Sequence, residues 1–110
     1  MTYRIKKLDE LCKKAKLAQS GYGPDHTGLD PHHICGKSTH ELRFDLDNIS
    51  LVTRTFHTTL HNNPRFARTH FIEKLGVDTY NRLEGLKNTA GDYFDFRAKE
   101  DEFREILDNR

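Results

Sequence analysis

The sequence predicts a small α+β protein in which a β-hairpin region is combined with several helices. Its 110 residues are enough for one domain with a modest core. Apolar side chains recur with helical spacing near both ends of the chain, whereas residues 32–52 contain short extended pieces separated by turn residues. We therefore expect a single domain over residues 1–110, with additional helices on both sides of the hairpin region.

An amphipathic helix is expected over residues 3–19, because apolar residues recur there every three or four positions with lysines between them. These apolar positions are Ile5, Leu8, Leu11, Cys12, Ala15 and Ala18. Two glycines and a proline follow at Gly21, Gly23 and Pro24 and end the helix. Residues 20–31 are expected to form a loop.

The hairpin region is expected to begin with an extended piece at residues 32–35. Residues 36–38, Gly-Lys-Ser, predict a turn, and further extended pieces are expected at residues 42–44 and 49–52. Residues 54–62 are expected to be helical, and the sequence Asn-Asn-Pro at 62–64 is expected to end that segment.

The remaining residues, 64–108, are expected to be mostly helical. A helix with apolar positions at Phe66, Phe71, Ile72 and Leu75 should end at Gly76. Asp78 is expected to cap the next helix, residues 88–91 to form a linker, and residues 92–108 to form the last helix. Aromatic side chains at helical spacing are expected in the core rather than in a base-stacking surface.

The charge is balanced overall but unevenly distributed. The chain has 18 Lys and Arg against 17 Asp and Glu, yet residues 1–22 carry six basic and two acidic side chains. Such a segment is typical either of a basic arm that meets phosphate or of a solvated helix face. The sequence contains no apolar run long enough for a membrane span and no signal-peptide pattern. With only two cysteines, it predicts a cytoplasmic protein without a membrane partner.

The histidines supply the candidate chemistry. His57 and His61 are four residues apart in a predicted helix, so both side chains share one face and can hold one metal ion. His32 and His33 are adjacent in a predicted strand, where neighbouring side chains point in opposite directions. One of them can therefore complete a metal site while the other faces a substrate.

Five residues in a fixed order carry a resemblance to a known family, and they are His32, His33, Asn48, His57 and His61. The pattern resembles the HNH endonucleases, also called ββα-metal or His-Me finger nucleases, over about residues 29–63. Its spacing is similar to that of the bacterial colicin DNases. Residues 41–48 and the run Phe-Ile-Glu-Lys-Leu-Gly at 71–76 resemble the NinG-like recombination nucleases of lambdoid phages. The resemblance implies a core made of a β-hairpin plus one helix.

The resemblance implies a metal-dependent DNA endonuclease that leaves 5′-phosphate and 3′-hydroxyl ends. In this interpretation His32, His57 and His61 hold one divalent metal ion. His33 is the general base, because an imidazole with a pKa of about 6.5 has a neutral form near pH 7. The Asn48 amide holds the strand and the ring of His33 in a productive orientation. A phage enzyme of this kind would act on DNA in the cytoplasm of its bacterial host, in DNA processing or recombination.

The metal ion is expected to be Zn²⁺, Mn²⁺, Ni²⁺ or Mg²⁺, and three imidazoles suit the first three better than Mg²⁺. Many HNH proteins also bind a structural zinc through Cys-x-x-Cys pairs. Cys35 has no cysteine nearby, so no structural zinc is expected, and packing by Phe56 is expected in its place. The default role of Cys35 is that of a small buried apolar residue. Asp30 is a candidate either for metal binding or for orienting a histidine.

Basic side chains that flank the motif are candidates for phosphate contacts, with solvated salt bridges as the alternative, and they are Lys37, Arg43, Arg54, Arg65 and Arg68. No element for reading base edges is evident, so weak sequence specificity is expected. His26 and His70 are expected to be surface or packing residues, and His40 is expected to be solvated at the surface, with contact to DNA as the alternative. The form of the DNA substrate and the oligomeric state are not predicted.

Two alternatives remain from the sequence. In a zinc-stabilised nucleic-acid-binding module, Cys35 and His32 would join the helical histidine pair. In a catalytically silent HNH adaptor, the motif would serve assembly instead of cleavage. A structural zinc site needs neither a second adjacent histidine nor an asparagine at position 48, and this favours the nuclease.

Overall fold

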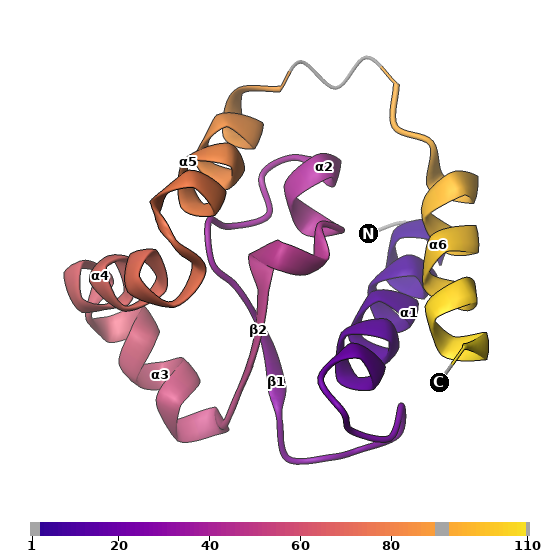
Figure 1. Cartoon of the computed structure of the whole chain (residues 1–110), viewed down its shortest axis with the longest axis horizontal. Helices are drawn as coiled ribbons and strands as arrows, with labels where there is room; N and C mark the ends of the chain where they lie inside the picture. Colours follow the sequence, from indigo (N-terminus) through magenta and orange to yellow (C-terminus); the bar gives the residue numbers. More distant parts are fainter. Residues whose placement is uncertain (1–2, 90–92, 110) are drawn as a thin grey trace. The chain divides into compact units, whose positions relative to one another are not determined.

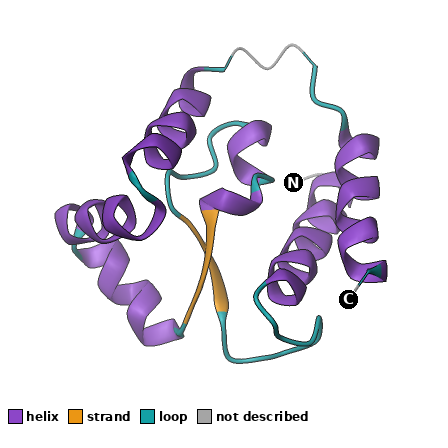
Figure 2. Ribbon diagram, in the orientation of Figure 1, coloured by secondary structure: helices purple, strands orange, loops and turns teal. Residues whose placement is uncertain are grey.

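The computed structural model describes residues 3–89 and 93–109, and it confirms the α+β prediction. The chain forms two compact units, one of residues 28–91 and one of residues 1–27 together with 92–110. We call them the central unit and the terminal unit. Helices make up most of both, and the central unit also holds the β-hairpin (Figures 1 and 2).

The terminal unit consists of α1 (Tyr3–Gln19) and α6 (Phe96–Asp108), which run parallel and pack against each other. The expected bounds of α1 are confirmed. Helix α6 begins later than residue 92, which itself lies outside the described residues, because the side chain of Asp95 caps it by accepting a hydrogen bond from the amide of Ala98 at 2.9 Å.

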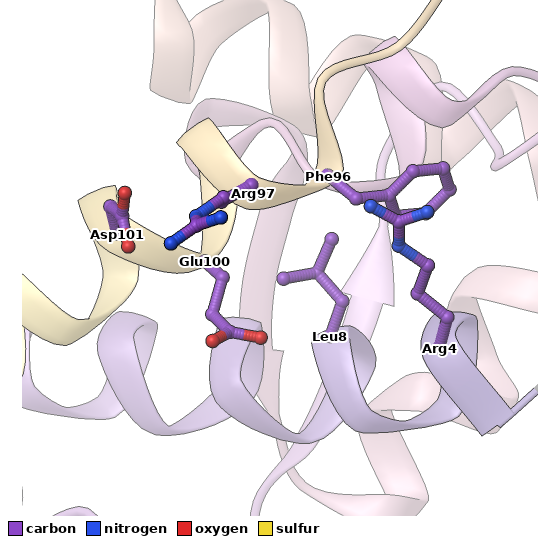
Figure 3. Close-up of a pocket in the computed structure, with 6 residues that line it drawn as sticks. All are labelled: Arg4, Leu8, Phe96, Arg97, Glu100 and Asp101. Atoms are coloured by element: carbon purple, nitrogen blue, oxygen red, sulfur yellow. The ribbon is translucent and has the colours of Figure 1, made fainter.

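A cavity of about 340 Å³ lies between α1 and α6 and opens to solvent (Figure 3). It is lined by Arg4, Leu8, Phe96, Arg97, Glu100 and Asp101. The guanidinium carbon of Arg4 lies 4.5 Å from the centroid of the Phe96 ring, a cation–π distance. This contact joins the first turn of α1 to the first turn of α6.

The central unit begins with a two-stranded antiparallel sheet of β1 (Asp30–His33) and β2 (Ile49–Val52). The register pairs Asp30 with Val52 and His33 with Ile49. The connection between the strands contains α2 (His40–Arg43) and a 3₁₀ turn, η1 (Leu46–Asn48). The chain then continues through α3 (Arg54–Asn62), α4 (Pro64–Leu75), α5 (Val77–Gly85) and the 3₁₀ turn η2 (Leu86–Asn88).

Two expectations for the hairpin region are wrong. The first strand spans residues 30–33 instead of 32–35, because the amide of Gly36 donates to the carbonyl of His33 and turns the chain there. Residues 42–44 are not extended, since residues 40–43 form α2. The hydroxyl of Thr39 caps this short helix by accepting a hydrogen bond from the amide of Leu42 at 3.2 Å.

The segments after the hairpin are helical, as predicted, and α3 and α4 also have their predicted positions. Asp78 does not cap α5, contrary to expectation: Gly76 occupies the cap position with a φ of 89°, and Asp78 lies in the first turn of the helix. A carboxylate there still interacts favourably with the helix dipole. Of the expected linker at residues 88–91, residue 88 belongs to η2, and residues 90 and 91 lie outside the described part of the chain.

The core of the central unit is apolar and draws on most of its elements. It consists of Cys35, Leu42, Val52, Leu60, Phe71, Tyr80 and Leu83. Cys35 is buried, as expected, and Phe56 packs against this cluster. The expectation that the aromatic side chains are in the core is wrong for Phe66, which is 48% exposed. None of the helices within residues 3–89 and 93–109 combines the length and the hydropathy needed to cross a bilayer.

Candidate metal centre

Three histidines converge in the central unit. His32 comes from β1, and His57 and His61 come from α3. Each offers a ring nitrogen, and these three atoms all lie within 4.8 Å of one another. The structure thus brings together the three residues that the sequence predicted as ligands, and this group can hold a metal ion.

The local sequence explains why the histidines meet. The hydroxyl of Thr53 caps α3 by accepting a hydrogen bond from the amide of Phe56 at 3.2 Å, so the helix begins directly after β2. Residues four apart on this helix share a face, which accounts for the pairing of His57 with His61. His32 shares a face of β1 with Asp30, and the imidazole of His57 contacts both of these residues.

The spacing and chemistry of the group fit a divalent metal ion. The Nε2 atoms of His57 and His61 are 3.1 Å apart. Two nitrogens bound to one tetrahedral Zn²⁺ at the usual bond length lie about 3.3 Å apart. Burial above all, followed by the neighbouring His57 and His61, lowers the pKa of His32 to about 4, so its ring is neutral at pH 7 and offers a lone pair.

A carboxylate orients one of the three rings. Asp30 Oδ2 lies 3.3 Å from Nδ1 of His57 and 2.9 Å from Nε of Arg54. The hydrogen bond with His57, assisted by Arg54, holds the pKa of Asp30 below its usual value. An ionised carboxylate only accepts hydrogen bonds, so Nδ1 of His57 carries the proton and Nε2 presents its lone pair towards His61. Of the two roles that the sequence left open for Asp30, this contact corresponds to orienting a histidine.

The ring of Phe71 supports His32 from the core. The two rings stack with centroids 5.5 Å apart and an interplanar angle of 17°. Phe71 is 1% exposed and packs against one face of the His32 ring, which is itself only 7% exposed. The sequence predicted Phe71 as an apolar helix position, but nothing in the pattern indicated that it would contact a residue 39 positions earlier.

His33 has different surroundings from those of His32. Its Nε2 lies 3.2 Å from the backbone carbonyl oxygen of Arg43, at the end of α2. A carbonyl oxygen only accepts hydrogen bonds, so Nε2 is the donor, and in the neutral ring Nδ1 carries the lone pair. Adjacent residues of one strand thus have separate environments, as their alternation in a strand predicts.

Asn48 is completely buried and organises the backbone around His33. Its Oδ1 accepts a hydrogen bond from the amide of Cys35 at 2.8 Å, and its Nδ2 donates to the carbonyls of Gly36 at 2.9 Å and Leu42 at 3.0 Å. Leu42 precedes Arg43, the residue whose carbonyl contacts the His33 ring. The predicted role of Asn48 in holding the strand and ring of His33 stays a prediction. Through the carbonyl of Leu42, Asn48 can position the neighbouring carbonyl that contacts His33.

We expect Asn48→Ala to lower the free energy of unfolding by about 3 kcal/mol, because it leaves a buried amide and two carbonyls without these partners. Urea denaturation of the metal-free protein measures this change. Asn81→Ala, at an exposed position on α5, is the control and should change stability by less than about 0.5 kcal/mol. Equal stabilities of the two variants would contradict the structural role of Asn48.

A second set of contacts fixes the segment that carries Asn48. Arg82 of α5 donates to Asp45 at 2.8 Å and to Asp47 at 2.9 Å. These hydrogen bonds raise the pKa of Arg82, and the bond to Asp45 makes the larger contribution. Sequence reasoning missed this clamp, because its members are 35 and 37 residues apart and carry no motif.

The predicted phosphate-contacting residues are spread over the central unit. Lys37 follows the turn after β1 and is exposed, Arg43 ends α2, and Arg54 begins α3 with its side chain 85% exposed. Arg65 and Arg68 are exposed on α4, where the guanidinium carbon of Arg68 lies 5.8 Å from the Tyr80 ring. Among the contacts described, Arg54 is linked to the histidine group through Asp30.

Comparisons of the chain with protein-family models, with curated proteins and with solved structures found no match. The resemblance to HNH endonucleases therefore stays a prediction from five residues. The functional argument below depends on the geometry of the histidine group and its neighbours.

The structure places Cys35 in the apolar core, whereas the described metal-binding group consists of histidines alone. Burial raises the pKa of Cys35 to about 11 and that of Cys12 to about 12. We therefore expect both thiols to be unreactive towards a disulfide reagent in the native protein at pH 8 and reactive after unfolding in guanidinium chloride. Fast native labelling that bound zinc suppresses would instead support the alternative in which Cys35 is a ligand.

Proposed function

We propose that this protein is a metal-dependent DNA endonuclease that hydrolyses phosphodiester bonds. The observation that carries the proposal is the juxtaposition of a three-histidine group able to hold a divalent ion with a fourth histidine, His33, at the next position of the same strand. The group of His32, His57 and His61 supplies the metal ligands, and His33 supplies the base.

Hydrolysis forms a bond between the water oxygen and phosphorus and breaks the bond from phosphorus to the 3′ oxygen, which leaves with a proton from solvent. The step requires a proton acceptor for the attacking water and stabilisation of negative charge on the phosphate. His32, His57 and His61 would hold a divalent cation, which would supply that stabilisation as a Lewis acid. His33 accepts the proton from the water at Nδ1. The carbonyl of Arg43 holds the opposite nitrogen of the ring at 3.2 Å, which fixes the tautomer and stabilises the ring once it is charged.

The charge around the group favours a polyanionic substrate. Residues 48–72, which include β2, α3 and most of α4, contain three arginines and no Asp or Glu. These arginines are Arg54, Arg65 and Arg68, and all three are exposed. Arg54 forms an ion pair with Asp30 at 2.9 Å, so the positive charge offered to a substrate comes mainly from Arg65 and Arg68. Positive charge of this kind binds the phosphate backbone without reading the sequence, so affinity should fall as salt concentration rises.

Incubation of the purified protein with supercoiled plasmid and, separately, with a labelled single strand tests this function. Separate reactions contain Mn²⁺, Ni²⁺, Zn²⁺ or Mg²⁺, and a matched reaction contains EDTA. We expect nicked and then linear plasmid with at least one ion, no cutting in EDTA, and 5′-phosphate ends on the product. Intact plasmid and intact single strands with every ion would overturn the proposal and would favour the silent adaptor.

Circular dichroism of the same samples separates the nuclease from the zinc-stabilised module. The core of the central unit packs through seven buried apolar or aromatic residues. We therefore expect EDTA to stop cutting and to leave the helical signal and cooperative thermal unfolding in place. Loss of the fold in EDTA would favour a structural role for the metal.

A further inference from the structure

Three aromatic rings contact one another at the surface of the helical pair α3 and α4. We call Phe56, Phe66 and His70 the aromatic patch. The centroid of Phe56 lies 5.4 Å from that of His70 and 6.4 Å from that of Phe66. The rings of Phe66 and His70 stack at 5.8 Å with an interplanar angle of 25°. Phe66 is nevertheless 48% exposed, so the packing orders its ring and leaves a large part of it in contact with solvent.

The aromatic patch is connected to the candidate metal centre at two points. His70 contacts Phe71 with centroids 4.8 Å apart, and Phe71 stacks on His32. Phe56 is the residue before His57 in α3. The patch, on α3 and α4, and the metal centre, on β1 and α3, thus share helix α3.

The charge next to the aromatic patch indicates the chemistry of its ligand. Arg65 is exposed and directly precedes Phe66, and Arg68 is exposed two residues later. The acid-free segment 48–72 contains the whole patch. A surface that combines ordered aromatic rings with cations binds a single strand of nucleic acid, because the rings stack on bases and the cations hold phosphates. In a duplex the faces of the bases are covered by their neighbours, so an aromatic ring on the surface cannot stack on them without unstacking.

We propose that Phe66, supported by Phe56 and His70, stacks on an unpaired base of single-stranded DNA. This inference rests on the proposed function, since the same strand would place a phosphate at the metal centre. It assigns the enzyme a preference for single-stranded or locally unpaired DNA over a continuous duplex. Arg65 and Arg68 hold the phosphates on either side of the stacked base.

Binding measured without metal tests the aromatic patch separately from cleavage. Fluorescence anisotropy in EDTA gives the affinity for a short labelled single strand and for the same sequence as a duplex. A 2-aminopurine base in the single strand reports stacking by a change in its fluorescence. We expect the single strand to bind more tightly, and Phe66→Leu to weaken its binding by about ten-fold or more with little change for the duplex. Phe66→Trp should retain the binding and the 2-aminopurine response.

Tyr22→Leu is the matched control. Tyr22 is 42% exposed and lies 4.6 Å from His26 between centroids, so it resembles the Phe66–His70 pair but belongs to the terminal unit. We expect this variant to bind both forms of DNA as the unchanged protein does. Circular dichroism and urea denaturation verify that both leucine variants are folded.

The possible outcomes distinguish this inference from the proposed function. If Phe66→Leu binds single strands normally, or if the 2-aminopurine signal does not respond, the stacking role is overturned even when the plasmid is cut. Loss of self-association in Phe66→Leu, detected by size-exclusion chromatography without any change in DNA binding, would also overturn it and assign the patch to a second copy of the chain. If Phe66-dependent binding is present but no metal supports cutting of any DNA, the stacking role is supported and the endonuclease is overturned.

Discussion

His33→Ala should lower the rate of phosphodiester cleavage by about 10²- to 10⁴-fold, the range typical for loss of a general base. The reason is that His33 follows His32 in β1 without being a member of the metal-binding group, and the carbonyl of Arg43 holds its Nε2 at 3.2 Å. Metal binding should persist in this variant, because His32, His57 and His61 are unchanged. Single-turnover cleavage of a labelled oligonucleotide and calorimetric titration with Zn²⁺ measure the two effects.

His26→Ala is the control for the removal of His33, because His26 lies in the terminal unit and contacts Tyr22. This variant should cut at the unchanged rate. Cleavage by His33→Ala at the unchanged rate would remove His33 from the mechanism. Loss of metal binding in that variant would instead make His33 a ligand and would require another residue as the base.

His61→Ala should abolish metal-dependent cutting and weaken metal binding by more than about a hundred-fold, exceeding the loss usual for a residue that only orients a ligand. His61 is suited to this test because it is exposed, so its removal costs little packing. Asp30→Asn should give the intermediate loss of about ten- to a hundred-fold, since the amide is a poorer partner for Nδ1 of His57 than the carboxylate.

Calorimetric titration of the four proteins with Zn²⁺ gives this series, with His26→Ala as the member that should not change. Circular dichroism verifies that each variant is folded. The order unchanged protein, Asp30→Asn and His61→Ala is expected for decreasing affinity. Unaltered affinity in His61→Ala would show that the three histidines do not share one ion, and the proposed mechanism would then fail.

The parts of the structure that depend on local periodicity could be predicted from the sequence. Helix α1 has its expected bounds, and α3 places His57 and His61 on one face because four residues make about one turn. The different surroundings of His32 and His33 also follow from a local rule, the alternation of side chains in a strand. The convergence of His32 with the helical pair was predicted from the resemblance.

The parts that depend on distant partners could not be predicted. Thr39 is a local N-cap signal for residues 40–43, but the buried Asn48, which holds the carbonyl of Leu42 from outside this short segment, has no signature within it. Helical spacing predicted an apolar face that includes Phe66, but it does not indicate how far neighbouring elements cover that face. The contact of Asp30 with His57 spans 27 residues and was one of two open possibilities.

The antiparallel register of β1 and β2 has a consequence for the tolerance of this hairpin to insertions. Because the pleat repeats every two residues, displacing β1 by one position against Val52 and Ile49 would exchange the two imidazoles at positions 32 and 33. The ring now stacked on Phe71 would turn outward, and its neighbour would enter the metal-binding group without Asp30 on its face. An insertion of one residue in this four-residue strand would therefore exchange the positions of His32 and His33.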